Sequence, residues 1–186
     1  MKTVLPALPV PNFVLFPCCT VSLQFGFPAL QDQLELARAH GGYIIVAHSL
    51  QGSKGWIPAK YGCLAEVRAI KGTPHGLQAT LAGVTRVKLL SEIQKGGRLF
   101  WECEQIEGLK WQRKKFPDLP GLPDKVKAYR SQLPPELWLD VAAFHIPNLP
   151  LEQKLLLLAE PDPGRRYYQL LESTREAQKK HRVSMN

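Results

Sequence analysis

The chain has 186 residues, of which 45% are hydrophobic and 22% are charged, and its formal net charge at pH 7 is +8. This length suffices for one large domain, or for one medium domain with a helical appendage, so the core needs no disulfide framework. No apolar run approaches the length that spans a bilayer, and the proline-rich N-terminal stretch has no signal-peptide cleavage site. We therefore expect a soluble, cytoplasmic protein without a membrane partner.

The first half of the chain is predicted to be rich in β-strands. Apolar or alternating runs bounded by proline or glycine predict strands at 12–16, 21–25, 43–47, 61–70, 75–82, 86–90 and 98–106. Leu30, Leu34 and Ala37 recur at helical spacing and predict one helix over 28–40. Residues 49–59 are predicted to form a loop that carries Trp56.

Glycines mark turns between these strands and irregular positions within them. The sequences Lys71-Gly-Thr-Pro and Lys95-Gly-Gly predict hairpin turns. Gly62 and Gly83 lie inside strand patterns, where glycine indicates a bulge or a close approach of two backbone segments. The pattern predicts a compact β-barrel with one inserted helix.

Composition changes after Glu107. Prolines, glycines and a basic run predict a linker over 108–124, and helical patterns follow at 125–133, 135–144, 150–160 and 163–182. Asp162 and Pro163 predict the N-cap and first position of the last helix. We expect three parts, with a β domain over 1–107, the linker over 108–124 and a helical subdomain over 125–186.

The positive charge is concentrated between Lys110 and Arg130, where seven basic residues stand against two acidic ones. Trp111 and Phe116 interleave with them, a pattern that can hold phosphates and stack bases. No recognised nucleic-acid motif accompanies the run, so a solvated connector is the favoured interpretation. The alternative is a nucleic-acid patch formed by Lys110, Arg113, Lys114 and Lys115.

Several short motifs together resemble the N-terminal substrate-binding domain of Lon proteases. The β part contributes Leu8-Pro-Val-Pro with Val14-Leu-Phe-Pro, Gly62 followed by Leu64 and Glu66, Gly83-x-x-Arg86, and Phe100-x-Glu-Cys-Glu. The helical part contributes Val141-Ala-Ala-Phe-His-Ile-Pro, Leu151-Glu-Gln-Lys-Leu-Leu-Leu-Leu-Ala-Glu and Arg165-Arg-Tyr-Tyr-Gln-Leu-Leu-Glu. Each motif is weak alone, but their order and spacing resemble the family over nearly the whole chain.

The resemblance implies an α+β fold with a PUA-like small β-barrel, one inserted helix and a C-terminal helical bundle. It also implies a stand-alone, non-catalytic module that binds unfolded or partly folded proteins in protein quality control. Two positions depart from the family, which usually has glycine where Cys18 stands and proline where Ser22 stands. We therefore expect the turn between the first two strands to differ in shape.

Catalytic chemistry is missing from the sequence. It has no Gly-Lys dipeptide, so no phosphate-binding loop, and Pro161-Asp-Pro-Gly lacks the serine of a serine-lysine peptidase. The histidines and cysteines show no metal-ligand spacing. We expect no enzymatic activity, no catalytic residue, no cofactor and no metal.

The leading hypothesis is recognition of unfolded or exposed hydrophobic segments, with open strand edges adding a peptide through backbone hydrogen bonds. The aromatic candidates for contact are Trp56, Tyr61, Trp111 and Phe116. One alternative is RNA binding through the basic 110–130 segment, whose affinity would fall steeply with salt. Another is an adaptor that docks on a full-length Lon protease through its helical tail.

Overall fold

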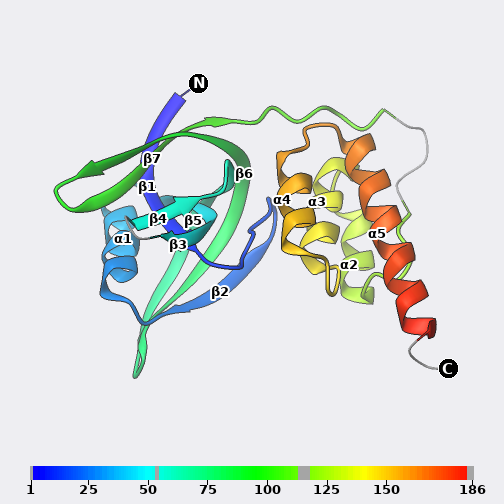
Figure 1. The fold of residues 1–186 in the computed structure, drawn as a ribbon, viewed down its shortest axis with the longest axis horizontal. Helices are drawn as coiled ribbons and strands as arrows, with labels where there is room; N and C mark the ends of the chain where they lie inside the picture. The colour runs from blue at the N-terminus through cyan, green and yellow to red at the C-terminus, as the bar shows by residue number, and fades with distance from the viewer. Residues whose placement is uncertain (1, 53–54, 113–117, 184–186) are drawn as a thin grey trace. The chain divides into compact units, whose positions relative to one another are not determined.

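The computed structural model describes residues 2–52, 55–112 and 118–183. Within these ranges it describes the backbone alone for residues 51, 52, 55, 56 and 176–183. The chain forms two compact units, Met1–Ile106 and Glu107–Asn186 (Figure 1). The first contains the strands and one helix, and the second contains the remaining helices. No helix in the described part of the chain has the length and apolarity to cross a membrane.

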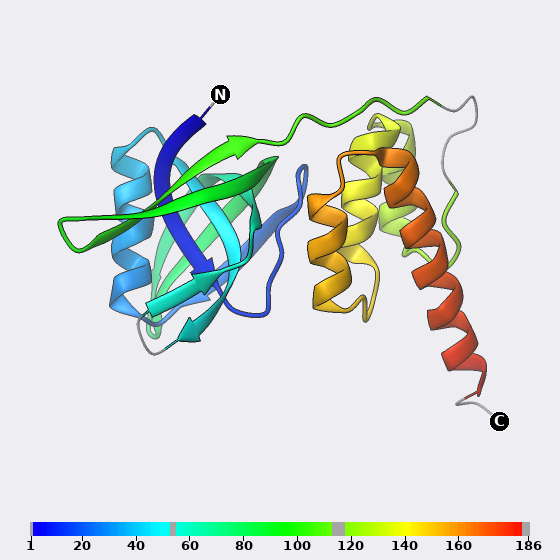
Figure 2. The ribbon, with the colours of Figure 1, turned by 45° about the horizontal axis from the view of Figure 1, so that its top comes forward.

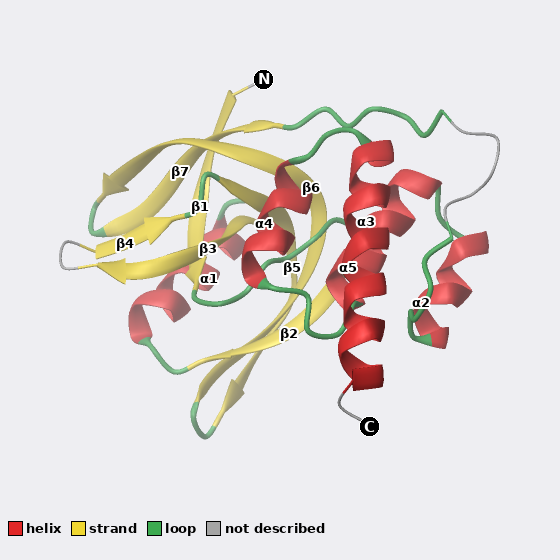
Figure 3. Ribbon diagram, turned by 45° about the vertical axis from the view of Figure 1, so that its right-hand side comes forward, coloured by secondary structure: helices red, strands yellow, loops and turns green. Residues whose placement is uncertain are grey.

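Among the described residues, seven strands and one helix build the first unit. They are β1 (Lys2–Val10), β2 (Thr20–Phe25), α1 (Pro28–Ala39), β3 (Tyr43–Gly52), β4 (Gly55–Pro58), β5 (Tyr61–Thr73), β6 (Gly76–Lys95) and β7 (Arg98–Gln105). Strand β1 pairs with β7 and, in parallel, with β3, so the pairing β1-β7-β6-β5-β3 returns to β1 (Figure 3). Strand β2 pairs with β6, and β4 pairs with β3. The mixed α+β class expected from the sequence is confirmed.

The core of this cycle is apolar. Trp101 is 1% exposed and packs with a cluster of buried residues from four strands, namely Ala7, Ile45, Ala47, Val87 and Cys103. Helix α1 lies against β1, as the turned view shows (Figure 2). Its buried residues include Leu30, Leu34 and Ala37, which are the three whose spacing predicted the helix. The predicted helix is confirmed.

The prediction of a strand at 12–16 is wrong. These residues form a turn and an irregular segment, and Asn12 has a positive φ of 54°. Val14, Leu15 and Phe16 are nevertheless buried, so the segment is apolar because it fills the core. The real strand is β1, which the prediction missed because Pro6 and Pro9 lie inside it. Each half of β1 pairs with only one neighbour, which is a setting where proline is tolerated.

Three further predictions, one loop and two strands, need correction. Residues 49–59 are not a loop, because β3 continues to Gly52 and pairs with β4. The predicted strands 75–82 and 86–90 are one strand, β6, which pairs with β2 before Gly83 and with β7 after it. The register with β5 shifts between the pairs Leu64–Thr85 and Ala65–Gly83, which leaves Val84 as the extra residue of a bulge.

Glycine is required at Gly83 and Gly62 by close backbone approach. A Cβ atom at Gly83 would lie 2.1 Å from the Phe16 carbonyl oxygen, and one at Gly62 would lie 2.7 Å from that of Val46. The predicted close approach is confirmed at both positions. The Lys95-Gly-Gly turn is also confirmed, since Gly96 and Gly97 have φ of 59° and 75° between paired Lys95 and Arg98.

The second unit is helical. It contains α2 (Asp124–Ala128), a 3-10 turn (Tyr129–Ser131), α3 (Pro135–His145), α4 (Leu151–Ala159) and α5 (Pro163–Val183). Asp162 Oδ1 accepts a hydrogen bond from Gly164 N–H at 2.7 Å, which confirms the predicted start of α5. Leu119 and Leu122 are 3% and 4% exposed, so the end of the proline-rich segment contributes to the apolar core.

A charged pair is buried in this unit. Arg166 on α5 donates a hydrogen bond from Nη1 to Asp140 Oδ1 on α3, and both side chains are 2% exposed. Trp138 on α3 is also buried and donates from Nε1 to the Val126 carbonyl of α2 at 3.1 Å. Polar contacts therefore link α3 to both α2 and α5 inside a largely apolar core.

Candidate protein-binding site

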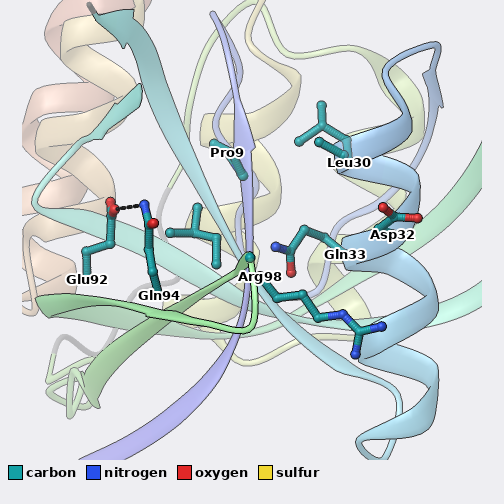
Figure 4. A pocket seen from close by; sticks show the side chains of 10 residues that line it. Pro9, Leu30, Asp32, Gln33, Glu92, Gln94 and Arg98 are labelled. Atoms are coloured by element: carbon teal, nitrogen blue, oxygen red, sulfur yellow. Dashed lines mark hydrogen bonds between the residues drawn. The ribbon is translucent and has the colours of Figure 1, made fainter. Parts of the chain in front are cut away.

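A pocket of about 200 Å³ lies in the first unit, between α1, the end of β1 and the β6–β7 hairpin (Figure 4). Its apolar lining consists of Pro9, Ala29, Leu30 and Leu99, and its polar lining includes Asp32, Gln33, Glu92, Gln94 and Arg98. Pro9 and Leu30 are buried, whereas the carboxylates and the guanidinium are exposed. The pocket therefore combines buried apolar surface with charged groups that reach solvent.

Gln33 holds one wall of the pocket in place. Its side chain is in a residue only 6% exposed, and its amide lies beside the backbone of Leu99. The amide oxygen accepts from Leu99 N–H at 2.6 Å and the amide nitrogen donates to Leu99 C=O at 3.1 Å. The pairing of β1 with β7 ends at Pro6 and Phe100, and the rest of β1 pairs with β3. The Gln33 amide therefore takes the place of a β1 neighbour and pairs with the backbone N–H and C=O of Leu99, the preceding residue of β7.

The polar groups around the pocket are carboxylates, amides and one guanidinium. Gln94 Nε2 donates to Glu92 Oε1 at 3.2 Å, while Asp32 and Arg98 extend from α1 and β7 (Figure 4). The pocket lining contains no histidine, cysteine, serine or lysine. Among the described residues, no group of three or more histidine, cysteine or acidic side chains is placed to hold a metal ion. Such a pocket fits one large apolar side chain.

The structure places two of the four aromatic candidates. Tyr61 begins β5, is half-buried, and has the Lys60 ammonium 5.9 Å from its ring centroid. Trp111 belongs to the second unit, where its half-buried ring packs edge-on against Tyr167 at 5.8 Å between centroids. The Trp56 side chain and Phe116 lie outside the described residues. Of the two candidates that the structure describes, neither Tyr61 nor Trp111 lines the pocket.

The basic candidates are described only in part. Lys110 is exposed in the segment that follows β7. Arg113, Lys114 and Lys115 lie outside the described residues. The nucleic-acid alternative therefore stays a prediction.

Sequence reasoning missed the pocket and a second apolar feature, Leu50 with Ile57. These two residues lie opposite each other on β3 and β4 and are 59% and 62% exposed. The predicted strand at 43–47 ends shortly before Leu50, and the following Gly52 and Gly55 favoured a loop. The pocket has no local signal, because 59 positions separate Gln33 on α1 from Glu92 on the β6–β7 hairpin.

Comparison with solved structures identifies the fold. The chain has the fold of a Lon N-terminal domain, as its motifs indicated. It matches the crystal structure of a Lon N-terminal domain protein from Xanthomonas campestris with a TM-score of 0.67 and 24% identity, covering 91% of this chain and 98% of that one. It matches the N-terminal domain of a Mycobacterium avium complex Lon protease with a TM-score of 0.73 and 17% identity, covering 93% and 98%. No family model and no curated protein matches the sequence.

Proposed function

We propose that the protein is a non-catalytic binding module that recognises unfolded or exposed hydrophobic polypeptide segments in protein quality control. The pocket between α1 and the β6–β7 hairpin is the observation that carries this proposal. Its apolar surface can contact a bulky apolar side chain of a bound polypeptide. Its charged and polar rim can contact the backbone of that polypeptide and the polar side chains beside the apolar one. The fold shared with Lon N-terminal domains supports the same role.

In this proposal the β-rich part, residues 1–107, is a PUA-like barrel that carries the recognition surface. The closed cycle of strand pairings supports the barrel assignment. The segment 108–124 is a linker, and 125–186 is a helical subdomain that forms a bundle. Trp56, Tyr61, Trp111 and Phe116 remain the predicted aromatic contacts.

A direct test uses a fluorescently labelled, permanently unfolded polypeptide titrated with the whole chain and followed by fluorescence anisotropy. The titration is run at low and high salt and with a single-stranded RNA of similar length as competitor. We expect binding that persists at high salt and that RNA does not displace, since apolar contacts are not screened by ions. Salt-sensitive binding displaced by RNA would refute the proposal in favour of the nucleic-acid alternative.

The pocket itself is tested by Ala29→Trp, which places an indole at an exposed position of the pocket lining. The matched control is Ala39→Trp, at the exposed last residue of α1 and outside the lining. We expect Ala29→Trp to weaken polypeptide binding about tenfold and Ala39→Trp to leave it unchanged. Equal affinities for both variants would show that the pocket takes no part.

A further inference from the structure

The outer edge of β2 differs from that of β4, another edge strand of the first unit. Strand β2 has six residues, Thr-Val-Ser-Leu-Gln-Phe, and none of them is charged or proline. In the described part of the chain it pairs with β6 alone, so its other edge is open. The edge strand β4, by contrast, has four residues and ends in Pro58. Short length and proline are devices that protect an edge from pairing, and β2 has neither.

The ladder shows which β2 residues direct their backbone groups to the open side. Cys18 N–H donates to the Gly83 carbonyl at 2.9 Å, and Gly83 N–H donates to the Cys19 carbonyl at 2.8 Å. Two residues thus oppose one, as in a G1 bulge, and Cys18 takes the left-handed position with φ of 59°. Beyond the bulge, antiparallel pairs alternate between hydrogen-bonded and non-hydrogen-bonded.

The alternation assigns the hydrogen bonds with β6 to Val21, Leu23 and Phe25. Thr20, Ser22 and Gln24 therefore direct their N–H and C=O groups away from β6. Ser22 Oγ lies 3.1 Å from Thr80 Oγ1 on the opposite strand, consistent with the closer side chains of a non-hydrogen-bonded pair. The open edge thus offers three donors and three acceptors in register.

The side chains of β2 set the chemistry of an added strand. Thr20, Ser22 and Gln24 are exposed, while Val21 and Leu23 on the other face are only half-buried. A strand laid beside β2 covers the remaining apolar surface of Val21 and Leu23 with its own apolar residues, and its alternate residues lie beside the uncharged polar ones. Phe27, which follows the strand and is 70% exposed, adds apolar surface at its C-terminal end.

We propose that the open edge of β2 binds an extended polypeptide segment with alternating apolar residues as an added β-strand. This inference rests on the proposed function, because it names the conformation in which an unfolded polypeptide is held. Ser22 is central to it, since its N–H is the middle donor of the edge. Serine keeps the backbone N–H donor that a proline at this position would lack.

The test replaces that donor without touching the β6 ladder. Ser22→Pro removes the outward N–H and places a ring at the edge, and Ser22→Ala is the matched control that removes only the hydroxyl. Both are titrated into the labelled, permanently unfolded polypeptide used above. We expect Ser22→Pro to bind about tenfold more weakly than the wild type and Ser22→Ala to bind equally well. Circular dichroism and thermal unfolding establish that both variants fold.

Amide hydrogen exchange gives an independent measurement on the wild-type chain. In the absence of polypeptide, the amides of Thr20, Ser22 and Gln24 should exchange much faster than those of Val21 and Leu23. Saturating unfolded polypeptide should slow the first set by at least tenfold. Protection that appears elsewhere while these amides remain fast would overturn the inference.

The outcomes separate this inference from the proposed function. If the wild type binds no unfolded polypeptide, the proposed function fails and the inference fails with it. If the wild type and Ser22→Pro bind equally, only the β2 inference fails. A dimer in sedimentation that Ser22→Pro abolishes, without polypeptide binding, would assign the edge to a second copy of this chain and overturn the proposal.

Discussion

Breaking the buried pair between Arg166 and Asp140 should destabilise the helical unit strongly. Each side chain is 2% exposed, so removing one partner leaves the other charge almost without solvent. We expect Arg166→Met or Asp140→Leu alone to lower the free energy of unfolding by about 3–5 kcal/mol. A domain of the size of Glu107–Asn186 has a total stability of about 4–12 kcal/mol, so either variant should be marginally folded.

The double variant Asp140→Leu/Arg166→Met decides between two physical explanations. If the penalty comes from an uncompensated charge, replacing both residues with apolar ones should restore stability to within about 1 kcal/mol of the wild type. Urea unfolding followed by circular dichroism at 222 nm measures the free energy of unfolding of the wild type, the two single variants and the double variant, because the second unit is helical. Single variants that lose less than about 1 kcal/mol, or a double variant as unstable as the sum of the singles, would refute the reasoning.

Two further predictions concern cysteines. Cys18 has φ of 59°, a conformation that strains any residue with a Cβ, so Cys18→Gly should stabilise the fold by about 0.5–1 kcal/mol. Thermal unfolding checks this, with Cys18→Ala as the control that should show no gain. Burial, helped by the charge of Glu102, raises the pKa of the Cys103 thiol from 9.0 to about 11. The Cys103 thiol of the unfolded chain therefore loses its proton at a lower pH than that of the folded chain. Between pH 9 and pH 11 the free energy of unfolding of the wild type should fall by about 2 kcal/mol more than that of Cys103→Ala. Parallel curves of stability against pH for the two proteins would contradict this.

Local patterns in the sequence were sufficient where one segment decides its own conformation. The spacing of Leu30, Leu34 and Ala37 predicted α1, and Asp162 with Pro163 predicted the start of α5. Gly96 and Gly97 predicted a tight hairpin because glycine accepts two successive positive φ angles without strain. The ordered motifs also indicated the fold that the structural comparisons confirm.

Features that depend on distant partners were decided only by the tertiary structure. Pro6 and Pro9 argued against a strand, yet β1 forms because β7 and β3 each pair with one half of it. The Gln33 amide pairs with the backbone of Leu99 and so joins α1 to β7 beside the pocket. No local sequence pattern predicts this contact between residues far apart in the chain. The open edge of β2 and the outward N–H of Ser22 follow from the register with β6 alone. The sequence by itself thus determined α1, the start of α5 and the Gly96-Gly97 turn. Non-local pairing determined which strand edges stay unpaired and which side chains are exposed, because hydrogen bonding between strands depends on neighbours that local sequence does not specify.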